Sequence, residues 1–368
     1  QATRETAHPQ GRTVIGVRVK IVMLSSGDRV PSSRFRMLPY IRHFRASGHR
    51  CTLASSIPQK YEWYPQIGFR LSQRLKRLIR YLHWYQSRFR ADDIVVIDRE
   101  VFDSPCTKLE ERFRKSTQRL VLDLDDAVFL RYPEKFEKLA RLADLIICGN
   151  AFIEEWSTER NPSTMIIPTC VEMAQYPAKD WSDAEGRVPR LGWIGTSGNL
   201  RYLEVAAVGL RQLAQKMDFE LHVIVPEIEP LSEINLDGVK VQHVPWQKEI
   251  EVDQLRQLDV GIMPLFATED WDRYKCGLKL IQYMAAGIPA VAAPVGVNAS
   301  IINHGQNGFL AESDEDWAAY LGTLASDLAL RKSIGNAARE TAVARYSIEA
   351  NYPRYEIALQ KLLASSRS

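Results

Sequence analysis

The stretch RYKCGLKLIQYMAAGIPAVAAPVGVN (273–298) decides how this sequence is interpreted. A turn containing Gly277 opens a helical segment associated with Lys275 and Lys279, and a run of small residues closes it. An all-apolar strand follows and ends at Gly296. A helix start with free N–H groups, a glycine that permits close approach and two lysines suit a phosphate group. An exposed basic helix is the alternative, but it does not explain the small residues that follow.

Length and composition are those of an ordinary globular protein with two domains. The chain has 368 residues, of which 45% are hydrophobic and 25% charged. No apolar run is long enough to span a bilayer, and no secretory signal opens the chain. Five cysteines without metal-type spacing favour a reducing cytosol. Residues 1–13 are polar and unpatterned, and we expect a disordered tail there, either a processed end or a cloning remnant.

Charge is distributed unevenly along the chain. The net charge is +3, but residues 1–170 contain 29 Lys and Arg against 19 Asp and Glu, whereas the remainder contains 19 against 26. The N-terminal half is therefore expected to face an anionic partner.

Short apolar runs rich in Val, Ile and Leu alternate with helical patterns, which is typical of parallel sheets covered on both faces. The predicted strands are 19–26, 51–56, 93–100, 119–126, 144–150 and 164–171, then 190–196, 219–226, 239–246, 260–265 and 288–296. A helix is predicted from Ser313, which is followed by acidic residues, and another over roughly 348–364.

These runs predict an α/β fold of two doubly wound domains. The expected division is an N-terminal domain (14–172), a polar linker (173–188), a C-terminal domain (189–345) and a closing segment (346–368). In such sheets, ligands bind at the carboxyl ends of the strands.

Two further strand ends in the second domain carry suggestive residues. GWIGTSGNL (192–200) is a strand that runs into a turn rich in Gly, Ser and Thr before a helix, an arrangement that can hold a phosphate. Such turns also carry these residues for steric reasons alone. VPW (244–246) could place main-chain groups and a ring against a base, although a packed Trp fits the pattern equally well.

The stretch KCGLKLIQYMAAGIPAVAAPVGVNASIINHGQNGFLA resembles the donor-site signature of glycosyltransferases with two facing Rossmann-like domains (the GT-B fold), especially family 4. The resemblance covers 190–345 well and 19–171 mainly as topology. It implies that the closing helix crosses back to the first domain. It also implies a donor site formed by Gly195, Thr196, Ser197, Arg201, Pro245, Trp246, Lys275, Gly277, Leu278, Lys279 and Gln282. The two lysines and the helix start would hold the diphosphate of a nucleotide-sugar.

The sequence departs from the family pattern at several of these positions. Family 4 usually has two glutamates flanking seven residues, and those positions are Tyr274 and Gln282 here. Gln282 can still hydrogen-bond a ribose diol, and Glu269, Asp270 or Asp272 could replace the sugar-binding carboxylate. The usual Arg and Lys of the phosphate loop are also missing. Thr196 occupies the Arg position, only Arg201 lies near the Lys position, and Lys275 and Lys279 are expected to compensate.

The first domain should bind the acceptor. LDLDD (122–126) places Asp125 and Asp126 at the end of a strand, where one of them, with Asp126 slightly preferred, would orient or deprotonate the acceptor hydroxyl. A helix cap or an ion pair with Arg is the structural alternative. A metal site is a weaker interpretation, because transferases of this fold usually neutralise the leaving diphosphate with Lys, Arg and helix dipoles. We therefore expect neither a metal nor a cofactor.

The segment SGDRVPSSRFR (26–36) follows the first strand. Gly27, Arg34 and Arg36 are candidates for the acceptor or phosphate side, where the arginines would meet an anion. A solvated helix start is the alternative.

The segment FRLSQRLKRLIRYLHWYQSRFR (69–90) contains Arg70, Arg74, Lys76, Arg77, Arg80, Arg88 and Arg90 and no acidic residue. Its apolar residues recur at helical spacing. Such a helix can lie on an anionic membrane, or its apolar face can be ordinary core. Nucleic acid is not expected, because a recognisable binding fold is missing.

Together these features predict a cytoplasmic glycosyltransferase, peripheral on the inner face of a membrane if 69–90 docks there. It would move a hexose or deoxyhexose from a nucleoside diphosphate to a hydroxyl of a glycan or lipid-linked acceptor, without metal, in polysaccharide or glycan biosynthesis. The resemblance implies retention of anomeric configuration. The alternatives are a nucleotide-sugar 2-epimerase of the same fold and a non-catalytic nucleotide-sugar-binding protein.

Overall fold

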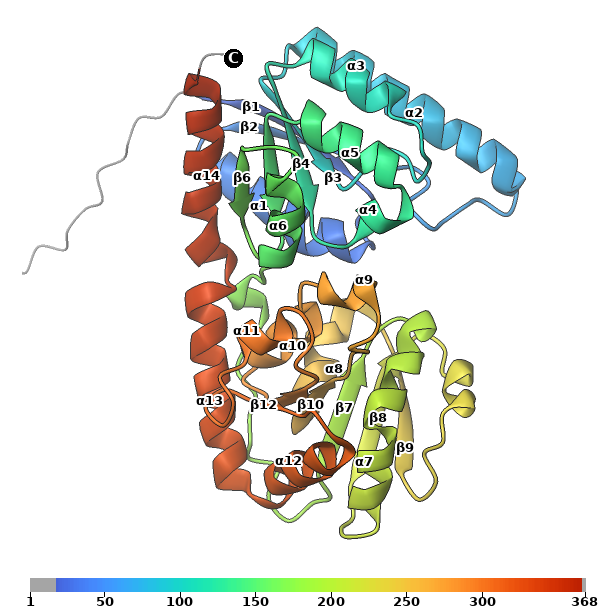
Figure 1. Ribbon diagram of the computed structural model, residues 1–368, viewed down its shortest axis with the longest axis vertical. Helices are drawn as coiled ribbons and strands as arrows, with labels where there is room; N and C mark the ends of the chain where they lie inside the picture. Colours follow the sequence, from blue (N-terminus) through green and yellow to red (C-terminus); the bar gives the residue numbers. More distant parts are fainter. Residues whose placement is uncertain (1–17, 366–368) are drawn as a thin grey trace, which may run out of the picture.

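The computed structural model describes residues 18–365 and contains two parallel β-sheets, one in each of two stacked domains (Figure 1). The expected α/β fold with two doubly wound domains is confirmed. The predicted tail, residues 1–13, lies outside the described residues.

Six parallel strands form the sheet of the N-terminal domain in the order β2-β1-β3-β4-β5-β6. The strands are β1 (Lys20–Ser25), β2 (Arg50–Ser55), β3 (Ile94–Asp98), β4 (Arg119–Leu124), β5 (Leu145–Cys148) and β6 (Thr164–Ile166). The central strands β3 and β4 are buried along their whole length, because helices cover both faces of the sheet. The helical segments are η1 (Ser33–Met37), α1 (Leu38–Ala46), α2 (Gly68–Arg90), α3 (Lys108–Ser116), α4 (Val128–Arg131), α5 (Pro133–Leu142) and α6 (Ala151–Thr158).

The second sheet also has six parallel strands, in the order β12-β11-β10-β7-β8-β9. They are β7 (Arg190–Ile194), β8 (Glu220–Val225), β9 (Lys240–Pro245), β10 (Val260–Met263), β11 (Ala290–Ala292) and β12 (Phe309–Leu310). The helical segments are η3 (Ser197–Leu203), α7 (Glu204–Ala214), η4 (Glu229–Glu233), η5 (Lys248–Ile250), α8 (Glu251–Arg256), α9 (Asp270–Arg273), α10 (Leu278–Ala285), α11 (Asn298–Ile301), α12 (Asp314–Ser326) and α13 (Leu328–Arg345). Between the two sheets the chain has a single short helix, η2 (Met173–Gln175), in the segment interpreted as the linker.

The last helix, α14 (Ile348–Ala364), returns to the N-terminal domain. Figure 1 shows α13 and α14 as one column along the side of both domains. The ring of Tyr355 on α14 makes an edge-to-face contact with Tyr40 on α1, with 5.0 Å between centroids. Ile348 and Leu359 are buried in the same hydrophobic cluster as β1 and β3. This apolar packing explains why the chain crosses back after α13.

Two predicted strands are less than half as long in the structure, and one strand was not predicted. The run 164–171 yields only β6, and 288–296 yields only β11. Prolines lie inside both runs, at Pro168, Pro289 and Pro294, and proline cannot donate to a strand ladder. The two-residue strand β12 is too short to leave a periodic pattern.

The two domains contact each other closely. Phe35 of the N-terminal domain is buried in the hydrophobic cluster of the second domain. The Asn150 side chain donates to the Tyr274 carbonyl oxygen at 2.8 Å, and Phe129 packs edge-to-face on the Tyr274 ring. The structure therefore represents a closed arrangement. Within residues 18–365, no helix has the length and apolar character needed to cross a membrane.

Candidate functional site

A cavity of about 310 Å³ lies between the two domains. The N-terminal domain contributes Arg29, Pro31, Arg34 and Phe35, and the C-terminal domain contributes Ile194, Gly195, Thr196, Asn199, Pro226, Trp246, Glu251, Leu278, Lys279 and Gln282. The second group comes from the carboxyl ends of β7, β8 and β9 and from the starts of α8 and α10. Seven predicted site residues thus meet in one place: Arg34, Gly195, Thr196, Trp246, Leu278, Lys279 and Gln282.

Lys279 is the lysine among the residues that line this cavity. Among the described residues its ammonium group has no hydrogen-bond or ion-pair partner, and it lies 5.3 Å from the centre of the Trp193 ring. Desolvation, together with the neighbouring charge of Lys275, lowers the pKa of Lys279 to about 8, against opposing effects of Asp272 and Asp126. A partly buried lysine without an ion-pair partner is costly. Such a group is typical of a site whose anion arrives as a ligand.

Lys275 lies outside the residues that line the cavity and is partly engaged. Its Nζ is 3.6 Å from Asp272 Oδ1 and 5.1 Å from the centre of the Tyr202 ring. Asp272 itself is fully buried and accepts from the Tyr202 hydroxyl at 2.6 Å and from the Phe266 amide at 3.1 Å. Asp272 therefore supports the local fold and is not a free replacement for the sugar-binding carboxylate.

Gly277 is required by the backbone. It precedes α10 with φ of +65°, the left-handed region that favours glycine. A Cβ atom there would lie 2.6 Å from Ile301 Cδ1. Gly277 is thus explained by the turn and by packing against α11, without any phosphate contact.

Glu251, at the start of α8, is hydrogen-bonded to several of the side chains that line the cavity. Its carboxylate is buried and accepts from Nη1 and Nη2 of Arg34 at 3.1 and 3.0 Å. It also accepts from the Trp246 indole at 2.7 Å and from Gln282 Nε2 at 2.8 Å. Arg34 therefore faces a carboxylate of the other domain in this structure. The oxygen of the Gln282 amide makes no hydrogen bond within the described part of the chain and borders the cavity.

The predicted phosphate loop has a different geometry from the one expected. The segment after β7 begins with the 3₁₀ helix η3 and continues as α7. The Ser197 hydroxyl accepts from the Glu227 amide at 3.0 Å. Arg201 is paired with Glu269 at 2.5 and 2.7 Å, on the outside of the cavity. Gly195 and Thr196 line the cavity, whereas Ser197, Arg201 and Pro245 do not.

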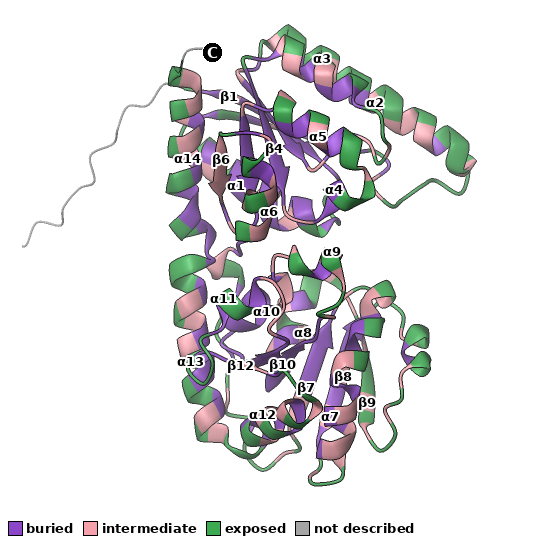
Figure 2. Cartoon of the chain, in the orientation of Figure 1, coloured by how far each residue is buried: buried purple, intermediate pink, exposed green. Residues whose placement is uncertain are grey.

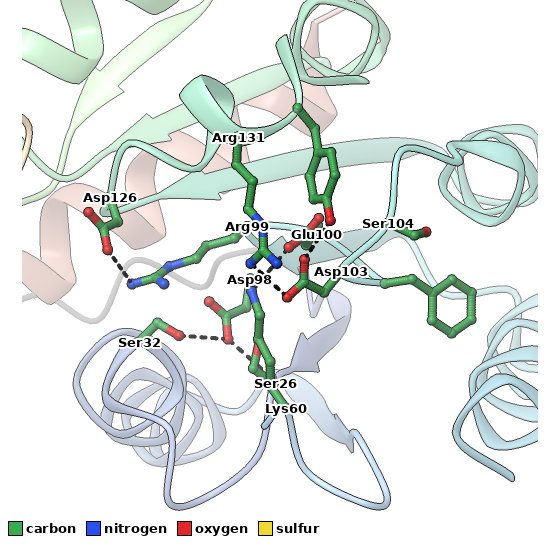
Figure 3. Close-up of polar contacts among 12 residues, drawn as sticks. Ser26, Ser32, Lys60, Asp98, Arg99, Glu100, Asp103, Ser104, Asp126 and Arg131 are labelled. Carbon is green, nitrogen blue, oxygen red and sulfur yellow. Dashed lines mark hydrogen bonds and ion pairs between the residues drawn. The ribbon is translucent and has the colours of Figure 1, made fainter. Parts of the chain in front are cut away.

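Asp125 and Asp126 follow β4 and share one arginine, Arg99. Asp125 Oδ1 accepts from Arg99 Nε at 2.5 Å. Asp126 Oδ2 is 3.7 Å from Arg99 Nη2, and Figure 3 shows this second contact. Burial would raise the pKa of Asp125, but the charge and hydrogen bond of Arg99 outweigh it and hold the pKa below its usual value. The pKa of Asp126 is raised, mainly by burial, even though Arg99 and Lys275 lower it. Asp126 is also the more exposed carboxylate, at 23% against 9%, so it is better placed to meet a hydroxyl.

The structure contradicts the prediction made for Arg36. Its guanidinium is buried, forms two hydrogen bonds with Asp123 at 2.5 and 3.1 Å, and donates to the Ile167 carbonyl oxygen at 3.0 Å. Burial raises the pKa of Asp123 to about 6, and Arg36 opposes that rise. The predicted contact of Arg36 with an anionic ligand is wrong for this closed structure, because its guanidinium is engaged in the ion pair with Asp123.

Gly27 also has a structural explanation. Its φ is +132°, and a Cβ atom would lie 2.4 Å from Gln59 Oε1. Its amide donates to the Ser25 hydroxyl at 3.0 Å. The glycine therefore shapes the turn after β1, and the neighbouring Arg29 is the residue of this turn that reaches the cavity.

Glu251 and Arg99 are two of the site residues that were missed from the sequence. Glu251 lies five residues after Trp246 at the beginning of a helix, in a run (248–251) with two acidic residues, a pattern equally typical of a solvated first turn. Arg99 directly follows β3 and has φ of +60°, an unusual backbone for a non-glycine residue. Its position at a strand's carboxyl end was the available signal.

Residues 18–365 contain no group of three or more His, Cys, Asp or Glu side chains that could hold a metal ion. LDLDD in particular does not form one, since Asp123 and Asp125 each pair with an arginine.

Comparison with known families supports the interpretation of the second domain. Residues 189–327 match the family described as "Glycosyl transferases group 1". D-inositol 3-phosphate glycosyltransferase of Pseudarthrobacter chlorophenolicus is 32% identical over 131 residues, which cover 35% of this chain and 28% of that protein. The corresponding protein of Arthrobacter sp. (strain FB24) is 30% identical over 138 residues, which cover 37% and 30%. Each match thus spans less than a third of the relative.

Solved structures resemble the whole chain. Sucrose-phosphate synthase from Thermosynechococcus elongatus has a TM-score of 0.72 at 14% identity and covers 94% of this chain and 100% of its own. A glycosyltransferase from Rickettsia africae has a TM-score of 0.66 at 14% identity, with 95% and 100% covered. HepE of Anabaena, solved with UDP, has a TM-score of 0.62 at 14% identity, with 93% and 100% covered. These likenesses establish the GT-B fold, and the expected resemblance to it is confirmed.

Proposed function

We propose that this protein is a glycosyltransferase that uses a nucleoside diphosphate sugar. The observation that carries the proposal is Lys279, a partly buried cation without an ion-pair partner among the described residues, in a cavity lined by both domains. The family match of residues 189–327 supports the same activity. HepE of Anabaena, which has this fold, was solved with UDP and with UDP-glucose.

In this proposal the diphosphate lies against Lys279 and the start of α10, whose first N–H groups point along the helix axis. Lys275 adds charge from the same segment. Gln282 accepts a ribose hydroxyl through its amide oxygen, and Glu251 holds the Gln282 side chain in place. The Trp246 ring lies beside the base. When the sugar–phosphate bond breaks, charge grows on the diphosphate, and these preorganised groups stabilise it.

The acceptor approaches from the N-terminal domain. Asp126 is the group placed to orient the hydroxyl and take its proton, because Arg99 engages Asp125 more strongly than Asp126. The raised pKa of Asp126 brings its basicity closer to working pH, as general-base catalysis prefers. Asp126 and Lys279 influence each other's charge across the cleft, so donor and acceptor would meet between them.

We further propose that transfer needs no metal ion, since lysine, arginine and a helix start supply the positive charge. Retention of anomeric configuration belongs to the proposal through the family resemblance alone. A hydroxyl of a glycan or lipid-linked carrier is the proposed acceptor. A cytoplasmic location fits the five free cysteines and a nucleotide-sugar substrate.

The test is a panel of UDP-, GDP-, ADP- and dTDP-sugars, with release of nucleoside diphosphate as the readout. Lys279→Met should abolish release, and Lys332→Met, a surface change on α13, should leave it unchanged. Epimerisation of the sugar without acceptor would assign the fold to the epimerase alternative. Nucleotide-sugar binding without turnover under any acceptor condition would assign it to a binding protein.

A further inference from the structure

Helix α2 packs with its polar face inward and exposes its apolar face. The buried residues of this 23-residue helix are Ser72, Arg80 and Ser87. Leucines and aromatics recur on the opposite side at alternating intervals of four and three residues, which places them on one stripe. The exposed members of this stripe are Leu71 at 51%, Leu78 at 58%, Leu82 at 48%, Tyr85 at 63% and Phe89 at 84%.

The buried arginine explains the orientation of the helix. Arg80 donates from Nη1 to the Ala54 carbonyl oxygen and from Nη2 to the Ser25 carbonyl oxygen, both at 2.8 Å. These carbonyl groups end strands β2 and β1, so Arg80 fastens α2 across the carboxyl edge of the sheet. Arg80 therefore does not belong to the basic surface predicted from the sequence. The alternative in which the apolar face of 69–90 is ordinary core is also ruled out by its exposure.

The exposed apolar surface continues into the segment before α2. Tyr61, Trp63 and Ile67 are exposed by 72%, 47% and 42%, and Phe69 in the first turn of α2 is exposed by 61%. In Figure 1, α2 runs along the outer side of the N-terminal domain, away from the second domain. Figure 2 shows its visible side mostly exposed or intermediate. A patch of this kind marks an interaction surface.

The charges beside the stripe point to the occupant. Arg70, Arg74, Arg77 and Arg88 are exposed, and none of the four forms an ion pair with another residue of the described chain. The sequence contains no Asp or Glu between Glu62 and Asp92. A second copy of this helix would bring arginine rows face to face, which disfavours pairing. An anionic lipid surface satisfies both the stripe and the arginines.

We propose that α2 and the segment before it dock the protein on an anionic membrane. The stripe would enter the headgroup region, and the arginines beside it would contact lipid phosphates. The docking face is continuous with the acceptor side of the fold. Gln73, Lys76, Arg77 and Arg80 of α2 also line a small cavity of about 80 Å³ at the ends of β1, β2 and β3.

That cavity is lined by Glu100, the chain neighbour of Arg99, which pairs with the candidate catalytic carboxylates. Its other lining residues include Lys60, Asp103 and Ser104, which Figure 3 shows in one group with Arg99 and Asp126. The geometry therefore favours an acceptor whose lipid anchor stays in the membrane while its headgroup enters from the side of α2. This second part rests on the proposed function, whereas docking does not.

The experiment is sedimentation with vesicles of phosphatidylcholine, either alone or with about 30% phosphatidylglycerol. About one anionic lipid in three gives the vesicles a negative surface potential like that of a cytoplasmic membrane leaflet. Binding should require the anionic lipid and weaken as salt rises. Arg70→Gln, Arg74→Gln and Arg77→Gln together should lower the partition coefficient on the order of 100-fold, since each contributes about fivefold near the surface. Leu78→Gln with Leu82→Gln and Phe89→Gln should abolish binding.

Matched changes elsewhere serve as controls. Lys216→Gln, Lys332→Gln and Lys361→Gln remove the same charge from other surfaces, and Val343→Gln with Ile357→Gln removes exposed apolar area. These variants should bind vesicles as the unchanged protein does. Lys279→Met should also bind, so that loss of catalysis does not remove docking.

Two results would overturn the proposal. One is no binding to anionic vesicles at low salt. The other is a dimer that dissociates in the Leu78→Gln, Leu82→Gln and Phe89→Gln variant, which would assign the stripe to a second copy. If the protein binds anionic vesicles but releases no nucleoside diphosphate, α2 remains a membrane-docking surface, and only the proposal of a lipid-linked acceptor is rejected.

Discussion

Replacing Lys279 by methionine should remove donor binding and at the same time stabilise the protein. Methionine has a similar length and lacks the charge. At neutral pH the folded protein holds the Lys279 ammonium in a partly buried site without an ion-pair partner among the described residues, so folding pays for its desolvation. The pKa of Lys279 falls from 10.5 to about 8 on folding. A difference of this size corresponds to about 3 kcal/mol of unfavourable free energy, at about 1.4 kcal/mol per pKa unit.

The lowered pKa of Lys279 determines how the stability of the folded protein changes with pH. Below pH 8 both states carry the proton, so the whole penalty is present. Between about pH 8 and 10.5 the unfolded state binds the proton and the folded state does not, so stability rises with pH through this window. The advantage of Lys279→Met should therefore be largest at pH 7 and shrink towards pH 10. A bound diphosphate should reverse the shift, so donor affinity should weaken above pH 8.

Denaturant unfolding at pH 7 and pH 10 measures the stability, and calorimetry with UDP-, GDP- and ADP-sugars measures the binding. We expect Lys279→Met to raise the free energy of unfolding by 1–3 kcal/mol, or about 2–4 °C of melting temperature per kcal/mol. Donor binding should fall by at least tenfold, because a charge-assisted contact contributes roughly 1.5–3 kcal/mol. A variant that is less stable and binds the donor normally would refute the reasoning, since Lys279 would then be a structural residue.

Three further outcomes follow from the site. Asp126→Asn should lower turnover by roughly 10²- to 10⁴-fold, the usual contribution of a general base, while donor binding by calorimetry stays within twofold; a parallel loss of melting temperature would make Asp126 a structural cap. Activity should survive EDTA, and complete loss restored by Mg²⁺ or Mn²⁺ would contradict the leaving-group assignment. Glu251→Gln should weaken donor binding and lower stability, because Arg34 keeps its buried charge without a carboxylate; Arg34→Gln in the same chain should recover part of the stability, and strict additivity would argue against their coupling.

The sequence was sufficient for the fold and for half of the residues that line the cavity. Alternating apolar runs specify parallel strands, and the carboxyl ends of parallel strands meet at one edge. Gly195, Trp246 and Lys279, which are far apart in the chain, therefore gather in one cavity. The glycine before α10 was predicted correctly as a turn, although its left-handed backbone and the contact with Ile301 explain it.

The orientation of helical side chains could not be predicted from composition alone. Arg34 and Arg36 are two residues apart on η1, and residues at this spacing do not face the same side of a helix. One reaches the cavity and Glu251, whereas the other is buried with Asp123. In α2 the same difficulty appears on a larger scale. The pattern identified an amphipathic helix, but only the bonds of Arg80 to two strand ends determine that the polar face is inside.

The charge asymmetry of the chain has a structural consequence. The second domain contributes most of the cavity residues but belongs to the half with an excess of acidic residues, and Lys279 is the lysine that lines the cavity. Two arginines at the same cavity, Arg29 and Arg34, come from the basic N-terminal domain, although Glu251 pairs with Arg34. Cations of both domains therefore line one cavity in this closed arrangement. Since a ligand favours the state in which it makes more contacts, the donor itself should favour closure, and closure brings Asp126 to the side of the cleft opposite Lys279.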